Sequence, residues 1–284
     1  MSSRSISAAR NSAKALAAAA ALSAAAAAEA QDFGREADTL RYPYVAALSR
    51  APEEGANRVY FCAGTLVAPQ WILTAAHCFH NTRRQRISDQ GLWAEVGASW
   101  LREVPEAAQV RVAEIVLHPG YDPASQDNDV ALVRLERIAG PLVAEIATAG
   151  RTADPAEATV LGFGSLYEGL LAGNATLGSG APAAQVSHRL RQAEVALIAP
   201  AECAERLGIG GAATGAYQIC AGAGARASCV GDSGGPLVVE AAGRGDRVAG
   251  IVSFGTGCGA ARPITVYTRV SAYAGWIRET MAGR

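Results

Sequence analysis

The sequence has no run of basic residues and no stripe in which Lys or Arg alternates with aromatic side chains. Its 25 Lys and Arg residues nearly balance its 26 Asp and Glu residues, so the formal net charge is −1. Proteins that bind nucleic acids need a concentrated positive surface, because they neutralise phosphate groups. Nucleic acid is therefore excluded as an expected partner.

A CxxC pair is also absent, although the chain has six cysteines. Structural zinc sites often take two ligands from such a pair, and the sequence shows no other metal or cofactor motif. We therefore expect neither a metal nor a cofactor. An even number of cysteines in an exported chain is typical of disulfide bonds, whose pairing the spacing alone leaves open. The cysteines are Cys62, Cys78, Cys203, Cys220, Cys229 and Cys258.

No apolar run is long enough to cross a bilayer, so we expect no membrane span. Residues 1–30 begin with three separated basic residues, Arg4, Arg10 and Lys14, continue with an uncharged Ala-rich run and end in Ala28-Glu29-Ala30, a small-x-small cleavage site. This layout predicts a secretory signal that is removed from the mature chain. Because the segment is rich in Ser, Ala and Arg, an organelle transit peptide is the alternative. We expect secretion, with an organelle lumen as the second location.

After residue 31, short apolar or alternating runs are separated by Gly, Pro, Asn and Asp. Many short strands at such spacing predict antiparallel β-sheets in a sandwich or a barrel. Examples of these runs are residues 44–48, 71–75, 110–117, 130–135, 158–162, 194–198, 236–240, 248–254 and 265–270. A helix is predicted over residues 271–281, where Tyr273, Trp276 and Ile277 recur at helical spacing.

Two segments are predicted to be loops, residues 51–57 and residues 165–187. The second contains Asn174-Ala175-Thr176, an acceptor pattern for N-glycosylation in a secretory pathway. Such three-residue patterns also arise by chance. Asn174 is therefore a candidate glycosylation site, with an unmodified loop as the equal alternative.

The most informative stretch is Gly231-Asp232-Ser233-Gly234-Gly235-Pro236. A serine hydroxyl is a weak nucleophile until a base takes its proton, and the attacked carbonyl needs hydrogen-bond donors where negative charge develops. Glycines let the chain turn tightly and bring backbone N–H groups close to a ligand. Standing alone, however, the stretch would be better interpreted as a Gly-rich turn.

Two further motifs supply the missing groups. Thr74-Ala75-Ala76-His77-Cys78 follows one predicted strand, and Asp127-Asn128-Asp129 begins another. A neutral imidazole accepts a serine proton near pH 7, while a buried carboxylate fixes its tautomer and stabilises the imidazolium. In isolation the histidine would be a core or surface residue and the aspartate a turn acid. Together the three groups form a complete set for acyl transfer.

These motifs resemble those of the trypsin/chymotrypsin family of serine proteases, in the same His, Asp, Ser order. The resemblance runs from about Gly34 to the C-terminal helix. It implies an all-β fold of two packed six-stranded antiparallel β-barrels (chymotrypsin-like) with a C-terminal α-helix. Residues 31–150 would form the barrel that carries His77 and Asp129, and residues 151–284 the barrel that carries Ser233.

The resemblance also implies a role for each residue. Ser233 would attack the scissile carbonyl, His77 would take and return the proton, and Asp129 would hold the ring. The N–H groups of Gly231 and Ser233 would form the oxyanion hole. Asp127 is the rival acid, but the family's aspartate directly precedes an apolar triplet, as Asp129 does.

The same resemblance pairs the cysteines and places the substrate-binding strand. The implied disulfides are Cys62–Cys78, Cys203–Cys220 and Cys229–Cys258. The substrate backbone would pair with Ser253-Phe254-Gly255, in which Phe254 stands where the family usually has Trp.

Substrate preference depends on the base of the primary specificity pocket, six residues before Ser233. That residue is Ala227, followed by Ser228, where trypsin-like members have Asp. A substrate cation would be costly to bury there unpaired, so cleavage after Arg or Lys is disfavoured. The resemblance places Thr265 where trypsin-like members have Gly, so its branched side chain should shorten the pocket from the opposite wall, while Gly255 leaves the entrance open. We expect cleavage after small or medium apolar residues such as Ala, Val or Leu.

The start of the mature chain departs from the family. Members typically begin Ile-Val-Gly-Gly when the zymogen is cut, and the freed amine pairs with the acid before the nucleophile, which here is Asp232. This chain reads Gln31-Asp32-Phe33-Gly34 in that register, a polar start in place of two aliphatic residues. One hypothesis is that cleavage after Ala30 delivers the amine directly, without a separate zymogen step.

The expected function is therefore a secreted, monomeric serine endopeptidase that acts on protein or peptide substrates, with protein inhibitors as further partners. The alternative is a catalytically inactive homologue that serves as a secreted binding or adhesion module, which only the altered N-terminus favours. Inactive homologues usually lose a member of the triad, and this chain keeps all three. An α/β-hydrolase esterase is excluded because its triad runs Ser, Asp, His.

Overall fold

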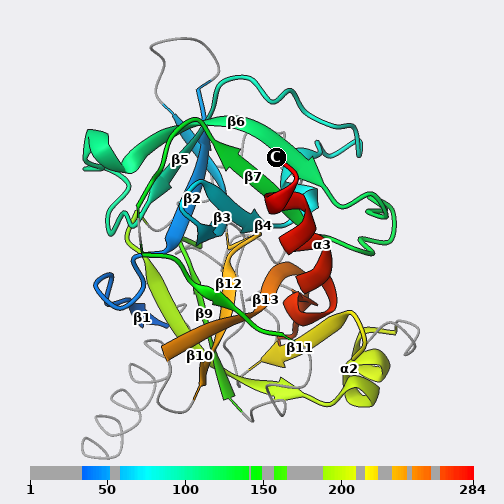
Figure 1. Ribbon diagram of the computed structural model, residues 1–284. Coiled ribbons are helices and arrows are strands. Elements are labelled where there is room, and N and C mark those ends of the chain that lie inside the picture. Colours follow the sequence, from blue (N-terminus) through cyan, green and yellow to red (C-terminus); the bar gives the residue numbers. More distant parts are fainter. Residues whose placement is uncertain are drawn as a thin grey trace, which may run out of the picture. The chain divides into compact units, whose positions relative to one another are not determined.

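The computed structural model of the chain describes residues 34–51, 58–140, 142–148, 157–164, 188–208, 215–222, 232–241, 245–256 and 263–284. These residues form two closed antiparallel β-barrels of six strands each, followed by a C-terminal helix (Figure 1). The predicted all-β fold class is therefore confirmed. Residues 1–30, Asn174 and nearly all of the two predicted loops lie outside the described ranges.

The first barrel closes in the strand order β2-β3-β4-β7-β6-β5, with β5 paired to β2. Its strands are β2 (Val45–Arg50), β3 (Val59–Ala68), β4 (Trp71–Thr74), β5 (Leu92–Val96), β6 (Gln109–Leu117) and β7 (Ala131–Leu135). Leu73 of β4 lies opposite Leu132 of β7. Both side chains are fully buried, so the central strands hold the apolar core and fix the positions where the chain enters and leaves the barrel.

The second barrel closes in the order β9-β10-β11-β14-β13-β12, with β12 paired to β9. Its strands are β9 (Glu157–Gly162), β10 (Arg191–Ile198), β11 (Gln218–Gly222), β12 (Pro236–Ala241), β13 (Gly245–Gly255) and β14 (Thr265–Arg269). Two short strands from earlier in the chain extend this sheet: β1 (Arg35–Glu36) pairs with β10, and β8 (Glu145–Ile146) runs parallel to β13. The N-terminal segment is thereby attached to the second barrel.

The helices are α2 (Pro200–Leu207), α3 (Val270–Ala282) and two 3-10 turns, η1 (Ala76–Phe79) and η2 (Glu106–Ala108). Helix α3 confirms the C-terminal helix predicted from the apolar spacing. Its Val270, Tyr273 and Ile277 are buried in a hydrophobic cluster that joins the first-barrel core to residues of β12 and β13, so α3 packs against both barrels (Figure 1). Among the described helices, none is both long and apolar enough to span a membrane.

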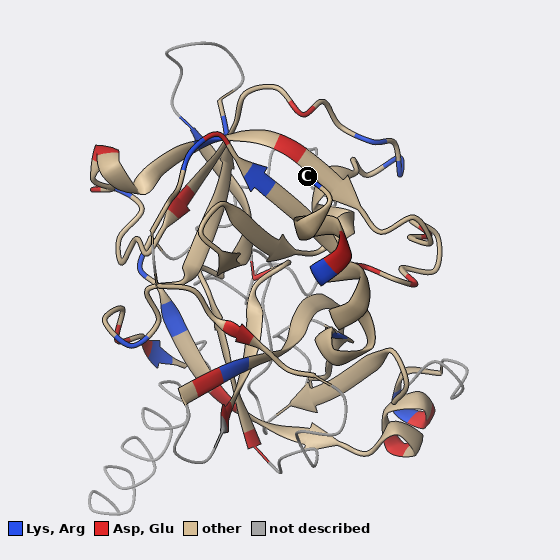
Figure 2. Ribbon diagram, in the orientation of Figure 1, with Lys and Arg blue, Asp and Glu red and all other residues tan. Residues whose placement is uncertain are grey.

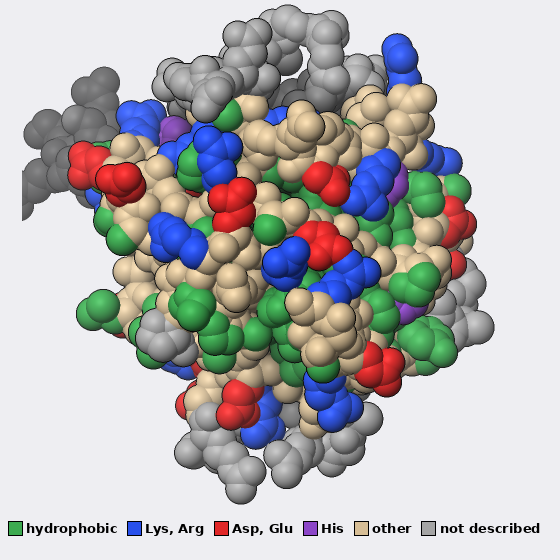
Figure 3. All heavy atoms as spheres, turned by 45° about the horizontal axis from the view of Figure 1, so that its top comes forward, with side chains coloured by type: hydrophobic (Ala, Val, Ile, Leu, Met, Phe, Trp, Pro, Cys, Tyr) green, Lys and Arg blue, Asp and Glu red, His purple; other side chains and the backbone are tan. Residues whose placement is uncertain are grey.

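Ion pairs link the start of β13 to segments that precede the second barrel in sequence. Arg41 approaches Asp246 at 3.0 Å, and Arg247 approaches Glu145 at 3.1 Å. Arg41 donates to both carboxylate oxygens of Asp246, the bidentate geometry that makes such pairs strongest. Elsewhere, basic and acidic residues are distributed along the loops and strands (Figure 2). On the face shown in Figure 3, residues of both charges are interspersed.

Candidate active site

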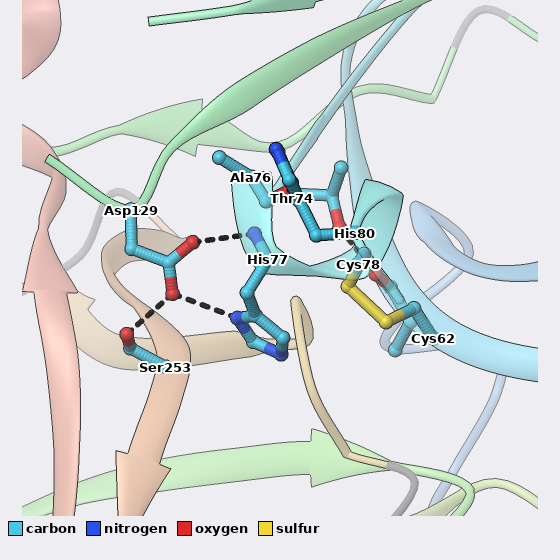
Figure 4. Close-up of a disulfide and its surroundings, with 9 residues drawn as sticks. Cys62, Thr74, Ala76, His77, Cys78, His80, Asp129 and Ser253 are labelled. Carbon is cyan, nitrogen blue, oxygen red and sulfur yellow. Dashed lines mark hydrogen bonds and ion pairs between the residues drawn. A yellow bond between two sulfur atoms is a disulfide. The ribbon is translucent and has the colours of Figure 1, made fainter. Parts of the chain in front are cut away.

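His77 lies on η1, the single helical turn that follows β4. The Cys62–Cys78 disulfide joins this turn to β3 across a Cα–Cα distance of 6.2 Å (Figure 4). The Thr74 hydroxyl donates to the Ala63 carbonyl of β3 at 2.7 Å. The segment that carries His77 is therefore fixed to β3 on both sides of the histidine.

Asp129 lies just before β7 and is 1% exposed. Its Oδ1 accepts the backbone N–H of His77 at 2.8 Å, and its Oδ2 lies 2.7 Å from Nδ1 of the same residue (Figure 4). An ionised carboxylate can only accept, so Nδ1 must be the donor and carry the proton in the neutral ring. Nε2 is thereby left as the proton acceptor.

The Ser253 hydroxyl of β13 is a third donor to this carboxylate, through Oδ2 (Figure 4). The sequence had assigned Ser253 only a place on the substrate-binding strand. The sequence carried a signal, because Ser253 is a polar residue in the otherwise apolar run that precedes Phe254. In the structure its side chain is buried. A buried hydroxyl needs a partner, and the nearest buried acid supplies it.

Burial lowers the pKa of His77, but the charge of Asp129 and its hydrogen bond outweigh burial, so the pKa lies above the ordinary value of 6.5. Burial raises the pKa of Asp129. The charge of His77 and the hydrogen bonds from His77 and Ser253 lower it by more than burial raises it, so the pKa lies below its ordinary value. The aspartate therefore stays ionised and stabilises a protonated imidazole.

Ser233 lies in the tight turn that leads into β12. Its carbonyl accepts the Ala63 N–H at 2.8 Å, and the next residue, Gly234, donates to the Val252 carbonyl at 2.9 Å. Gly234 has φ +78°, and a Cβ on it would lie 3.2 Å from the backbone nitrogen of Ala75, two residues before His77. The turn is therefore packed against the segment that carries the histidine. Within the described ranges no hydrogen bond joins Ser233 Oγ to His77 Nε2, a bond that often forms only when substrate binds.

Asp232 is fully buried behind this turn. Its Oδ1 accepts the Gly164 N–H at 2.8 Å. A Cβ on Gly162 would lie 2.0 Å from Oδ1, and one on Gly164 would lie 2.5 Å from Oδ2. Glycine at both positions is therefore needed for the carboxylate to reach its place in the core.

The strand that the resemblance assigns to substrate is β13. Gly255 lies opposite Thr265 of β14, and Thr265 is 3% exposed. Phe254 is partly buried and packs against the cluster around the Cys203–Cys220 disulfide. Both disulfides that lie within the described ranges have the implied pairing. Gly231, Ala227, Ser228 and the Cys229–Cys258 pair lie outside the described ranges.

Two other features among the described residues add no group to this chemistry. Cys62, His77 and Cys78 come within 4.8 Å of one another, but the two sulfurs are bonded to each other and offer no thiolate to a metal. A cleft of about 780 Å³ opens on the first barrel between Ser49, Glu95 and the 101–104 loop. Its lining does not include the histidine, the buried aspartate or the serine described above.

Comparison with known proteins agrees with this geometry. Residues 32–277 match the family model described as Trypsin. The chain is 36% identical to coagulation factor XII of Sus scrofa over 255 residues, which is 84% of the chain and 37% of that protein. It is 34% identical to hypodermin-B of Hypoderma lineatum over 250 residues, 87% of the chain and 85% of that protein.

Serine protease 56 of Mus musculus is 35% identical over 233 residues, 78% of the chain and 34% of that protein. The chain thus spans little more than a third of the length of factor XII and serine protease 56, and most of the length of hypodermin-B. The family match covers nearly all of the described fold and both barrels. The chain belongs to the trypsin family of serine proteases.

Proposed function

We propose that the chain is a secreted serine endopeptidase that cleaves peptide bonds through an acyl-enzyme, with Ser233 as nucleophile, His77 as general base and Asp129 as the residue that orients the histidine. The observation that carries the proposal is the double contact of one buried carboxylate with the backbone N–H and the Nδ1 of His77, at 2.8 and 2.7 Å. This contact fixes the tautomer whose Nε2 can accept a proton.

The proposed reaction begins when Ser233 Oγ attacks the scissile carbonyl carbon and its proton passes to His77 Nε2. Backbone N–H groups of Gly231 and Ser233 would stabilise the oxyanion. The imidazolium, stabilised by Asp129, then protonates the leaving amine as the C–N bond breaks. Water deprotonated by the same histidine hydrolyses the ester, which releases the acid product and restores the serine.

The proposed mechanism requires a defined pH dependence. The histidine acts only when Nε2 is unprotonated, and its pKa lies above 6.5. We therefore expect kcat/KM to be low in acid and to rise with pH along a limb with a midpoint above 6.5, because kcat/KM reports the ionisation of the free enzyme. Initial rates on one peptide across pH 5–9 measure this midpoint. A midpoint near the ordinary pKa of an acid, about 4, would contradict His77 as the base.

We further propose that the enzyme prefers small or medium apolar residues on the amino side of the cut. Support comes from Thr265, a buried β-branched residue opposite Gly255 on the proposed pocket wall, and from the uncharged Ala227 in the sequence. On a panel of peptides that differ only at this position, Ala, Val and Leu should turn over at least about tenfold faster than Arg and Lys, since an unpaired buried cation is costly.

The same panel, assayed with Ser233→Ala, provides the matched control. This variant should fold normally and show no cleavage, so a rate that survives it would belong to a contaminant. Fastest turnover with Arg or Lys would overturn the proposed preference while leaving the protease assignment intact. No cleavage by the wild-type chain with any peptide would favour the inactive homologue.

The proposed domain organisation places His77 and Asp129 in the half formed by residues 31–150 and Ser233 in the half formed by residues 151–284. All strands of the first barrel lie in the former and all strands of the second in the latter. Activation would place a freed N-terminal amine beside Asp232. The pairing of β1 with β10 supports the proposal, because β10 also pairs with β9, which ends at Gly162 beside this carboxylate.

A further inference from the structure

The turn that delivers Asp129 has an unfavourable backbone. Gln126 has φ 59° and Asn128 has φ 54°, both in the left-handed region that residues with a Cβ rarely adopt. The cost is about 1–3 kcal/mol for a residue such as Gln126 and smaller for Asn128, because Asn is one of the residues that tolerate this region. The hydrogen bonds that hold this turn therefore decide where the Asp129 carboxylate lies.

Asn128 is held from both ends of its side chain. Its amide nitrogen donates to the Gly120 carbonyl at 2.8 Å, and its amide oxygen accepts the Tyr273 hydroxyl of α3 at 3.0 Å. Burial is the largest cause that raises the pKa of Tyr273, to about 12, so the hydroxyl remains a donor throughout the neutral range. The ring of Tyr273 also packs edge-on against His118, with centroids 5.2 Å apart. The C-terminal helix thus holds the residue before the aspartate.

Asp129 itself is held through its main chain. The Thr268 hydroxyl of β14 donates to the Asp129 carbonyl at 2.8 Å, and Thr268 is 4% exposed. Because Thr268 belongs to the second barrel and Asp129 to the first, this bond spans the two barrels. The backbone contact from Thr268 is independent of the side-chain contacts that Asp129 makes with His77 and Ser253.

We propose that Thr268 and Tyr273 are positioning residues that set the Asp129 carboxylate against His77. This inference rests on the proposed function, since it assigns a role in the same reaction. Loss of either hydroxyl leaves the triad intact in composition but releases a backbone that prefers another conformation. The carboxylate then moves away from the two nitrogens it must contact, and misplacement of about 1 Å can cost about 100-fold in rate.

The test compares Thr268→Val and Tyr273→Phe with two matched controls. Thr268→Ser keeps a hydroxyl on β14, and Tyr44→Phe removes a buried hydroxyl that has no hydrogen-bond partner among the described residues. Thr268→Val and Tyr273→Phe should each lower kcat about tenfold with KM nearly unchanged, because the carboxylate acts on the transition state and not on substrate binding. Thr268→Ser and Tyr44→Phe should stay within about twofold of wild type.

The pH profile separates positioning from general damage. A more distant carboxylate raises the His77 pKa less, so the acid limb of kcat/KM should move to lower pH in Thr268→Val and return in Thr268→Ser. An unshifted limb with wild-type kcat in Thr268→Val, or equal losses in Thr268→Val and Thr268→Ser, would overturn the inference. Thermal melts confirm that each variant is folded before its rate is read.

A readout that needs no activity keeps this inference distinct from the proposed function. The proton on His77 Nδ1 can be followed by NMR in a Ser233→Ala background, where it reports the contact with Asp129 directly. Thr268→Val should shift or broaden this signal and Tyr44→Phe should not. If the wild type cleaves nothing, the proposed function fails while this signal still decides the inference; an unchanged signal in Thr268→Val would reject it.

Discussion

Replacement of His77 by alanine is expected to lower kcat by about six orders of magnitude, the loss typical of removing the base from a catalytic triad. The serine hydroxyl then has no acceptor for its proton, and the leaving amine has no donor. Substrate binding should change little, because the proposed pocket lies on β13 and β14 and not on η1. The loss should therefore appear in kcat and not in KM.

The matched control is His188→Ala. The chain has four histidines, and His188 is exposed and lies in the lining of the separate cleft on the first barrel. Its replacement should leave kcat within about twofold, as surface substitutions usually do. Equal kcat in His77→Ala and wild type would remove His77 from the mechanism, even if the chain proved to be a peptidase.

Gly234→Ala is expected to destabilise the fold and to lower activity together. The added Cβ would lie 2.1 Å from Thr74 Oγ1 and 2.5 Å from the Ala63 carbonyl oxygen, and the residue would keep φ +78°. A left-handed backbone costs about 1–2 kcal/mol for a residue with a Cβ, and overpacking costs about 1–3 kcal/mol. The free energy of unfolding should thus fall by about 2–5 kcal/mol, as the sum of the two costs.

The same clash should reduce kcat by about 100-fold or more, because displaced Thr74 and Ala63 lie between the serine turn and the segment that carries His77. Denaturant titration measures the stability change. Gly275→Ala is the matched control, since a Cβ there meets nothing within 4 Å and the residue is exposed in the middle of α3. It should stabilise the protein by about 0.5–1 kcal/mol. Equal stability of Gly234→Ala and wild type would contradict the packing described here.

Much of the fold could be predicted from the sequence because strand propensity and turn residues act locally. All nine predicted strands are present, together with the C-terminal helix. The barrel strands β3, β5 and β11 are not among the predicted runs. In β3, Ala63 and Gly64 at the middle favour strands poorly. Glycine is nevertheless required at position 64, since a Cβ there would lie 2.5 Å from the Ile72 side chain.

Helix α2 was also missed, and its end signals explain how it forms. Pro200 stands at its first turn, and Gly208 ends it at φ 65° in the left-handed conformation. With only eight residues, the helix is too short for apolar spacing to distinguish it from a loop. The end residues, and not the periodicity, were the usable signal.

The residues of the candidate site also differ in how far the sequence could predict them. The three motifs propose His77, Asp129 and Ser233 as the catalytic residues because each lies in a recognisable local context. The residues that hold Asp129 have no such context: Thr268 and Tyr273 bond to the aspartate turn across 139 and 145 positions of sequence. The sequence around a hydroxyl in a strand or a helix does not indicate its hydrogen-bond partner. Only the packing of β14 and α3 beside the first barrel brings these hydroxyls to the aspartate turn.

Covalent labelling of Ser233 with a fluorophosphonate probe tests the central claim most directly, because the probe phosphonylates a serine only when a neighbouring base has activated it. Intact mass and peptide mapping of the expressed chain should show one adduct, on Ser233, in the wild type. Ser233→Ala should carry none, and His77→Ala should label at least about 1,000-fold more slowly, since the base is missing. An unlabelled wild-type chain, or labelling of Ser233 at the same rate without His77, would contradict the account.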